Sequence, residues 1–549
     1  MVVRTSSLSL FAPTMASLWD RSLADLAQET TTMLLDEENR PYLFAAVVVA
    51  LVSYTLYQHQ REQSFGTPVM HHPPEGRSLP YLGHAIHFLQ YRPWDLLTGW
   101  HRQYGPIVGF TLVGNTLFSI ASPSLIKAAL QSKIGSVKKD IQNTMKPFLV
   151  ILGTGIVTSE NKAWMKQRLK MSHPLRFDVL EMIPRQTLAA VQRWMEEMDA
   201  ACDSNETIAV GSSLRHLTLQ VISGTFLSLS AEESDSTFAK LYLPIVDESN
   251  LRVWHPYRPY LFFLPFFWRH LWNVRRLNVY VSYLIRQRWQ LRRKESGSTD
   301  RPEDILDRVL VVYEKEFSGR TTIPESDVRQ LRDEMKTFML AGHETSAAMM
   351  TWCLYELVGS DSLMEQVRSE SDSVFDPKVD WATADEAVIP QAEELAKLKW
   401  SEASLRESLR KYSVVPIVAR RTIEDLSLED GKYLVPKGSS LMINIQAVHL
   451  DPSIWPEPMK FRPSRFIDQK IEPFTFLPFI AGPRNCLGQH LALLESKMVI
   501  SLVTQRYRFR LPEGETVEAE DWTGEKDPRH RFIVPVIPKK ELMVHVSRR

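Results

Sequence analysis

The chain has 549 residues, of which 44% are hydrophobic and 24% are charged, and this composition excludes disorder of the whole chain. Lys and Arg total 65 and Asp and Glu total 65, so the formal net charge of zero excludes a global basic field for holding nucleic acid. The three cysteines, Cys202, Cys353 and Cys486, are too few for a disulfide scaffold, an iron–sulfur cluster or a Cys-rich zinc site.

The N-terminal region contains the candidate membrane segment. Residues 1–40 form a tail whose first 19 residues include Arg4 but no acidic residue, which is typical of a targeting segment or a disordered tail. Residues 41–57 are 17 residues without a charge. As a helix they would cover about 25 Å, at the short end of what a hydrocarbon core needs. We expect a single transmembrane anchor, with a buried or interfacial helix as the alternative.

The rest of the chain is predicted to be a hinge followed by one large domain. Residues 58–83 hold four prolines, which cannot continue a helix and indicate a stiff hinge. Residues 84–549 show long amphipathic helical patterns and no second linker or repeat. Strand-like patterns occur around 106–122, about a Gly-Asn turn, and around 426–445, with an Asp-Gly hairpin signal. The fold class is therefore mainly α (α+β), with small β-sheets beside helices.

Cys486 is the most informative of the candidate functional residues. A loop rich in Pro and Gly precedes it, and an apolar-periodic helix is expected to begin at Leu487. A helix N-terminus favours the anionic sulfur, so we expect a lowered thiol pKa and a strong metal ligand. Gly482 and Gly488 let the backbone approach a flat, bulky ligand, and Arg484 can meet an anionic group. An inert core cysteine is the alternative.

The frame Phe479-x-x-Gly482-x-Arg484-x-Cys486-x-Gly488 resembles the haem-ligand loop of the cytochrome P450 superfamily. The resemblance extends over about residues 65–549 and implies a P450-like helical fold. It also implies that Cys486 is the proximal thiolate ligand of a b-type haem, with the other four residues of the frame at the haem.

A second motif lies in an expected long helix. Ala341, Gly342, Glu344 and Thr345 match the oxygen-activation motif of the same family. A glycine inside a helix costs about 1 kcal/mol relative to alanine, and a carboxylate among apolar residues is costly unless it is paired or solvated. The resemblance implies that Gly342 leaves space for dioxygen, while Glu344 and Thr345 deliver protons as catalytic residues. An ordinary helix face with a buried threonine is the alternative.

A third motif is the pair Glu407 and Arg410, which the i, i+3 spacing places on one helix face. The segment 461–466, FRPSRF, resembles the family segment that carries a second arginine, here Arg465, although Ser464 stands where an acid is usual. The resemblance implies a buried structural set of one glutamate and two arginines that supports the cysteine loop.

Further basic residues are expected near the haem. Trp164 and Arg168 lie one helical turn apart, and the resemblance implies that both donate to haem propionates. One of Arg420 and Arg421 is expected to do the same, and we favour Arg420. The run around Trp164 has no acidic residue and predicts a docking face for an acidic electron donor, or else a solvated helix face; its cations are Lys162, Lys166, Arg168, Lys170 and Arg176.

The aromatic-rich segment 253–277 lies where the family places its lid helices. We expect an apolar access wall that dips into the membrane, with ordinary core as the alternative. Cys202 and Cys353 are interpreted as structural.

Together the motifs predict a membrane-anchored haem-thiolate monooxygenase, an oxidoreductase that inserts one oxygen atom of O2 into a C–H bond of a lipophilic substrate. A fatty acid, a carotenoid or a sterol fits this class. The implied cofactor is haem b, and the implied partners are O2, the membrane and an NADPH-dependent reductase or a ferredoxin, with no nucleic acid. A haem-thiolate desaturase or isomerase acting on a lipid stays open, as does a non-enzymatic haem-binding membrane protein. We expect the endoplasmic reticulum with a cytosolic catalytic domain; a plastid or mitochondrial location is the alternative.

Overall fold

The structure is a computed structural model, and it describes residues 82–90, 92–131, 136–172, 174–175, 178–294, 304–317, 320–517, 535–538 and 540–549. The expected tail (1–40), anchor (41–57) and most of the hinge (58–83) lie outside the described residues. Among the helices of the described ranges, none combines the length and the apolar character that a bilayer crossing requires.

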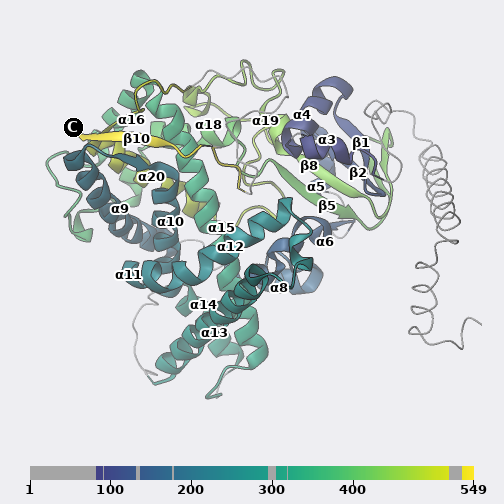
Figure 1. Cartoon of the computed structure of the whole chain (residues 1–549), viewed down its shortest axis with the longest axis horizontal. Helices are drawn as coiled ribbons and strands as arrows, with labels where there is room; N and C mark the ends of the chain where they lie inside the picture. Colours follow the sequence, from purple (N-terminus) through teal and green to yellow (C-terminus); the bar gives the residue numbers. More distant parts are fainter. Residues whose placement is uncertain are drawn as a thin grey trace, which may run out of the picture. The chain divides into compact units, whose positions relative to one another are not determined.

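Most of the described residues are helical (Figure 1). The α-helices are α3 (Ala85–Gln90), α4 (Pro93–Tyr104), α5 (Pro123–Gln131), α6 (Ile141–Thr144), α7 (Leu149–Leu152), α8 (Asn161–Ser172), α9 (Asp178–Ser204), α10 (Val210–Leu227), α11 (Ala231–Glu233), α12 (Lys240–Trp254), α13 (Pro265–Lys294), α14 (Ile305–Glu316), α15 (Glu325–Val358), α16 (Asp361–Val374), α17 (Ala392–Leu395), α18 (Lys399–Lys411), α19 (Ile445–His449) and α20 (Gln489–Arg506). Other short helical turns are η3 (Lys146–Phe148), η4 (Ser234–Ala239), η5 (Arg258–Tyr260), η6 (Glu386–Val388) and η7 (Pro463–Phe466).

The strands of the described ranges form three small sheets, in line with the limited strand patterns of the sequence. They are β1 (Ile107–Leu112), β2 (Asn115–Ile120), β3 (Val137–Lys139), β4 (Thr207–Ala209), β5 (Ile417–Thr422), β6 (Leu426–Leu428), β7 (Tyr433–Val435), β8 (Ser440–Asn444), β9 (Tyr507–Arg510) and β10 (Met543–Arg548). The sheet orders are β1-β2-β8-β5-β3, β4-β10-β9 and β6-β7. In the largest sheet β2 and β8 run parallel, with Phe118 opposite Leu441.

Both expected hairpin regions contain strands. β6 and β7 pair antiparallel, and the connection places Glu429, Asp430 and Gly431 at φ of 47°, 55° and 91°. Aspartate is among the residues that enter the left-handed region most readily, and the φ of 91° at Gly431 lies beyond that region for residues with a side chain, which explains the Asp-Gly signal. Between β1 and β2 the residues with positive φ are Val113 and Gly114, so the turn lies one residue earlier than the expected Gly-Asn pair.

The chain divides into two compact units. The smaller unit is described at residues 82–85 and 111–114, where the His84 amide donates to the Thr111 carbonyl oxygen at 2.8 Å. The larger unit includes residues 86–110 and 115–549, and it contains every element that forms the sites discussed below.

Helix α15 is central to the larger unit. It contacts α10, α13, α18 and α20, and its buried face includes Leu331, Met335, Met350 and Trp352 (Figure 1). At Gly342 an added Cβ would lie 2.6 Å from Cδ1 of Ile222 on α10. The absence of a side chain at Gly342 therefore lets α10 and α15 approach closely at this point.

Helix α20 begins at Gln489, two residues later than the expected start at Leu487. The reason lies in the loop before it, because the Cys486 amide donates to the carbonyl oxygen of Phe479 at 2.9 Å. This bond closes the cysteine loop on itself, and Gly488 then precedes the first helical residue.

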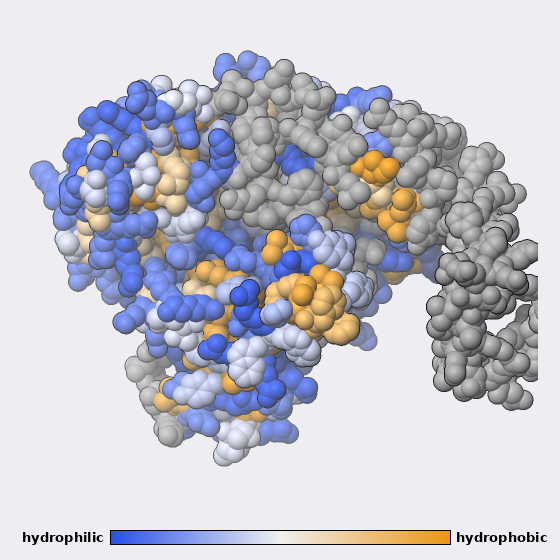
Figure 2. All heavy atoms as spheres, in the orientation of Figure 1, coloured by the Kyte–Doolittle hydropathy of each residue, from blue (hydrophilic) through white to orange (hydrophobic). Residues whose placement is uncertain are grey.

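The aromatic segment 253–277 forms the end of α12, η5 and the start of α13. Five of its large side chains are exposed: Tyr260 (69%), Phe262 (62%), Phe263 (68%), Trp268 (60%) and Trp272 (60%). Phe266 and Phe267 are half-buried, and Leu277 belongs to the core. Figure 2 shows apolar side chains gathered on this face near the end of α12. These five side chains are therefore on the surface and not in the core.

Candidate functional site

A cavity of about 310 Å³ separates helix α15 from the cysteine loop. Phe338, Ala341, Gly342 and Thr345 line it from α15. The cysteine loop supplies Phe479, Arg484, Cys486 and Gly488, and apolar side chains close the sides, among them Ile222, Phe226, Val414 and Val418. The cavity thus brings residues of the cysteine frame and of the oxygen-activation motif to one place, although 145 residues or so separate them in the chain.

The thiol of Cys486 faces this cavity. It is unpaired and accessible from the cavity, while protein atoms surround it on its other sides. Burial raises the pKa of the Cys486 thiol above its ordinary value, against the opposing effects of the Gly488 amide and the positive charge of Arg168. The expected lowering of this pKa is therefore wrong for the protein without a ligand, because desolvation outweighs the helix terminus. A cation at the cavity would reverse the balance by stabilising the thiolate.

Gly488 and Gly482 differ in what their missing side chains provide. A Cβ on Gly488 would meet no atom within 4 Å, so this glycine borders open space at the cavity. Gly482 has φ of +80°, a conformation that favours glycine, and it lies beside the cavity rather than in its lining. The space beside Gly488 is the kind of cradle that a flat ligand fills.

Arg168 and Arg484 tie helix α8 to the cysteine loop. Arg168 donates to the backbone oxygen of Asn485 at 2.9 Å and to its side-chain oxygen at 2.6 Å. The Arg484 guanidinium lies over the Trp164 ring, 4.1 Å from its centroid, and pairs with Glu160 at 2.7 Å. These contacts place Trp164, Arg168 and Arg484 at one edge of the cavity.

Two further cations complete a cluster at this edge. Arg420 is buried and lines the adjoining pocket of about 530 Å³ together with Lys139, Trp164 and Arg484, whereas Arg421 is half exposed and points to Asp140 at 4.0 Å. Burial and the charge of Arg484 lower the pKa of Arg420 to about 10. Burial and then the charges of Arg484 and Arg420 lower the pKa of Lys139 to about 7.

The net charge of this cluster shows whether the site fits a haem. It contains Lys139, Arg168, Arg420 and Arg484, and Glu160 is the carboxylate that acts on it. Four cations beside one carboxylate leave an excess of positive charge, which the two propionates of a haem would neutralise. Lys139 was missed in the sequence, where the only signal is its place next to Lys138, shortly before the acid-free run.

The two catalytic candidates of the α15 motif, Glu344 and Thr345, line different cavities. Thr345 lines the cavity and donates its hydroxyl to the carbonyl oxygen of Ala341 at 2.6 Å. Glu344 lines a neighbouring cavity, where Arg215 Nε donates to its Oε1 at 2.7 Å and His343 Nε2 lies 3.1 Å away. Burial raises the pKa of Glu344, but His343 and Arg215 outweigh it and hold that pKa at about 2. Glu344 is therefore ionised at neutral pH.

Glu407, Arg410 and Arg465 meet in the buried region beneath the cysteine loop. Arg410 binds Glu407 through two hydrogen bonds of 2.7 and 2.8 Å, and Arg465 Nε lies 3.3 Å from the same carboxylate. Arg410 also donates to the backbone oxygen of His449 at 2.9 Å.

His449 links this cluster to the cysteine loop. Its Nε2 accepts a hydrogen bond of 2.8 Å from the amide of Leu477, where the loop begins. Burial and the charge of Arg410 lower the pKa of His449 to about 3, so the ring is a neutral acceptor at neutral pH. His449 was missed in the sequence because no motif marks it.

The basic run of α8 is partly neutralised. Lys166 and Lys170 pair with Glu316 of α14 at 3.1 and 2.5 Å, and Lys170 also lies over the Tyr313 ring. Lys162 lines the pocket that holds Arg420, and Arg176 lies outside the described residues.

Comparison with known proteins agrees with this geometry. The family model described as cytochrome P450 matches residues 73–530. Cytochrome P450 4c21 of Blattella germanica is 27% identical over 85% of this chain and 93% of its own length. Cytochrome P450 4F8 of Homo sapiens is 27% identical over 76% and 78%, and Protein LUTEIN DEFICIENT 5, chloroplastic, of Arabidopsis thaliana is 24% identical over 75% and 68%.

The chain therefore belongs to the cytochrome P450 family. It is an oxidoreductase of the monooxygenase class, with a mostly helical P450 fold that carries small sheets. The family implies a haem-iron cofactor, dioxygen, a lipophilic substrate and electrons from a redox partner.

Proposed function

We propose that this protein inserts one oxygen atom into a C–H bond of a membrane-borne lipid, at a haem b held by Cys486. The observation that carries the proposal is the position of the Cys486 thiol, which faces Thr345 and Gly342 of α15 across one cavity. A ligand between these two walls would have a thiolate on one face and the oxygen-activation motif on the other.

The residues that would hold the haem fall into two groups. Cys486 would bind the iron, while Trp164, Arg168, Arg420, Arg484 and the newly found Lys139 would bind the propionates. Phe479 and Gly488 would contact the ring from the cysteine side, with Gly482 shaping the loop. Gly342 would border the ring on the α15 side, although Ile222 of α10, and not open space, fills the position of its missing side chain. The haem would supply the one-electron chemistry and the activation of dioxygen.

The proton path combines Thr345 and Glu344. Because the Thr345 hydroxyl donates its proton to the Ala341 carbonyl oxygen, it presents its oxygen to the cavity as a hydrogen-bond acceptor. Glu344, being ionised, is able to accept a proton on the solvent side of α15 and return it toward Thr345. Arg215 has to yield part of its contact with Glu344 for this exchange.

The set of Glu407, Arg410 and Arg465 is proposed to be structural. Arg410 holds the backbone of His449, and His449 holds the amide of Leu477 at the start of the cysteine loop. Through these two bonds the buried charges fix the loop that carries Cys486.

The proposed substrate is lipophilic, and the part of it that reacts carries no charged group. The cavity walls near α15 are apolar, with Ile222, Phe226, Phe338, Met349 and Val414 in the lining. Fatty acids, carotenoids and sterols all meet this requirement. One relative carries lutein in its name, which supports testing carotenoids beside fatty acids.

The proposed domain organisation places the catalytic domain (84–549) at a membrane, through the anchor at 41–57 and the exposed aromatic side chains between α12 and α13. We propose the endoplasmic reticulum, with a plastid or mitochondrion as the alternative. A chain that lacks residues 1–61 should remain partly bound to vesicles, and complete release would remove the aromatic surface from this proposal.

The proposed electron donor is an NADPH-dependent reductase or a ferredoxin that docks on the basic surface of α8. Lys162 supports this docking, while Glu316 reduces the charge of Lys166 and Lys170. Raising the ionic strength should therefore slow the first electron transfer.

The decisive test of the reaction uses isotopically labelled dioxygen. The purified protein is incubated with a reductase, NADPH and a lipid extract, and the products are analysed by mass spectrometry. A lipid product that carries one labelled oxygen atom supports the proposal. A desaturated or isomerised product without label would instead identify a haem-thiolate desaturase or isomerase.

A further inference from the structure

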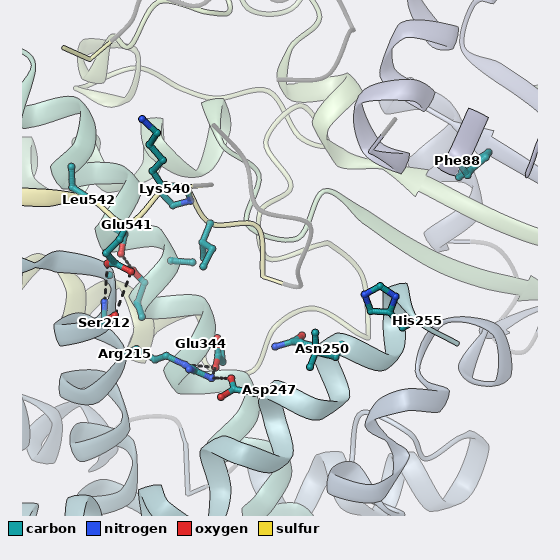
Figure 3. Close-up of a pocket in the computed structure, with 17 residues that line it drawn as sticks. Phe88, Ser212, Arg215, Asp247, Asn250, His255, Glu344, Lys540, Glu541 and Leu542 are labelled. Atoms are coloured by element: carbon teal, nitrogen blue, oxygen red, sulfur yellow. Dashed lines mark hydrogen bonds and ion pairs between the residues drawn. The ribbon is translucent and has the colours of Figure 1, made fainter. Parts of the chain in front are cut away.

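A second cavity, of about 700 Å³, lies beside the haem site but on another face of α15. Its described lining comes from the start of α10, the end of α12, the middle of α15, the stretch that leads into β10, and Phe88 of α3 (Figure 3). Glu344 and Ala348 border this cavity, whereas Thr345 and Met349 border the haem cavity. The volume lies within the range of about 300–1,000 Å³ that small-molecule sites occupy.

Four charged groups among the described lining residues, Arg215, Asp247, Glu344 and Glu541, already have polar partners. Arg215 lies between Asp247 and Glu344, at 2.7 Å from an oxygen of each, and Glu541 accepts the Ser212 amide at 3.1 Å (Figure 3). With Lys540 included, the described lining contains three carboxylates and two basic side chains. This balance gives no excess positive charge with which to bind an anion.

Among the described residues of the lining, one buried side-chain oxygen has no hydrogen-bond partner. Asn250 of α12 is 6% exposed, and within the described part of the chain its side-chain oxygen has no hydrogen-bond partner. A buried, unpaired amide oxygen costs free energy that a ligand with a hydrogen-bond donor would recover. Around it the walls are apolar, with Leu251, Ala347, Ala348, Ile537 and Leu542.

We propose that this cavity is a second ligand site, which takes an uncharged amphipathic alcohol with its hydroxyl on the Asn250 oxygen and its apolar body against α15. The site lies apart from the haem, so it goes beyond the proposed function. A bound alcohol would cover the solvent side of the Arg215–Glu344 pair and would limit the access of water to Glu344.

The test measures how many molecules of radiolabelled octan-1-ol the haem-loaded full chain binds in equilibrium dialysis, together with the Soret spectrum. The proposal requires one bound equivalent that leaves the Soret band unchanged. That equivalent should be lost in Leu251→Trp, which fills the cavity from an exposed position (45%). It should be kept in Leu291→Trp, a matched exposed leucine (44%) on α13 outside the cavity.

Two further comparisons test the role of the hydroxyl. Asn250→Leu should weaken this equivalent by about threefold to tenfold, the usual contribution of one hydrogen bond, and octane should bind more weakly than octan-1-ol by a similar factor. The proposal is overturned if every bound equivalent shifts the Soret band, if Leu251→Trp binds as much as the unaltered chain, or if Asn250→Leu has no effect. None of these outcomes depends on the oxidation of a substrate, so they leave the proposed function to its own test.

Discussion

The Nε of Arg215 on α10 lies 2.7 Å from Oε1 of Glu344 on α15, and this contact joins two residues that are 129 positions apart in the sequence. Arg215 also binds Asp247 of α12 at 2.7 Å. The acid of the oxygen-activation motif is therefore held in its ionised form by the adjacent His343 and by Arg215, a residue outside that motif.

Replacement of Arg215 should change the pH dependence of turnover. In Arg215→Gln, Glu344 loses one of the two partners that lower its pKa against the effect of burial. The pKa of Glu344 should therefore rise from about 2. A larger fraction of Glu344 is then protonated at mildly acidic pH, and the acidic limb of the pH–rate profile should move to higher pH. Arg292→Gln, which breaks a pair with Glu314 elsewhere, is the control. An unchanged acidic limb in Arg215→Gln would remove Glu344 from the proton path.

Loss of the Thr345 hydroxyl should uncouple electron use from product formation. Thr345→Ala should keep its haem but release more of the reducing equivalents as peroxide, because proton delivery at the cavity is impaired. The measurement is the ratio of peroxide to NADPH consumed. Thr351→Ala is a matched control, since Thr351 donates to Ala347 at 2.8 Å in the same way but lies outside the haem cavity. Equal peroxide ratios in the two variants would contradict the assignment.

Neutralising Glu407 should destabilise the fold. In Glu407→Gln, Arg410 and Arg465 keep their buried charges without a counter-charge, which typically costs about 3–5 kcal/mol in the free energy of unfolding. Glu402→Gln removes two looser pairs near the surface, with Arg406 and Lys497, and should cost less than about 1 kcal/mol. Denaturant unfolding followed by circular dichroism measures both. Similar costs for the two variants would show that Glu407 does not act as a buried structural charge.

Lys139 should make the stability of the haem-free protein depend on pH. Its pKa is lowered from 10.5 to about 7 in the folded chain, so between these values the unfolded chain binds more protons and stability rises with pH. Propionates beside Lys139 would raise its pKa again. The increase of stability with pH should therefore be smaller in the haem-loaded protein than in the haem-free protein.

The measurement for Lys139 is the Tm of both forms across this pH range. Lys139→Met should flatten the rise in the haem-free protein, while Lys138→Met, at the neighbouring position of β3, should not. The same slope in the haem-free and haem-loaded forms would argue against propionates at this cluster.

Local patterns in the sequence predicted most of the fold. The mainly helical architecture and the hairpin of β6 and β7 depend on periodicity and turn residues. The meeting of the cysteine frame with the α15 motif was implied by the resemblance of both motifs to those of the P450 family. The start of α20 was placed two residues early, because the sequence does not show that the Cys486 amide bonds to Phe479.

Properties that depend on burial could not be predicted from the sequence. The pKa of the Cys486 thiol is raised rather than lowered, since desolvation is set by how the surrounding elements pack. Arg215, His449 and Lys139 were missed for a related reason. Each acts through a partner far away in the chain, and no short motif records such a pair.

The central claim is that Cys486 is the thiolate ligand of a haem, and the absorption difference spectrum of the reduced, carbon monoxide-bound protein tests it most directly. The unaltered chain and Cys202→Ser should both show a strongly red-shifted Soret band, because thiolate ligation is intact in both. Cys486→Ser should lose this band. A histidine-type band in the unaltered chain, or an unchanged red-shifted band in Cys486→Ser, would contradict the account.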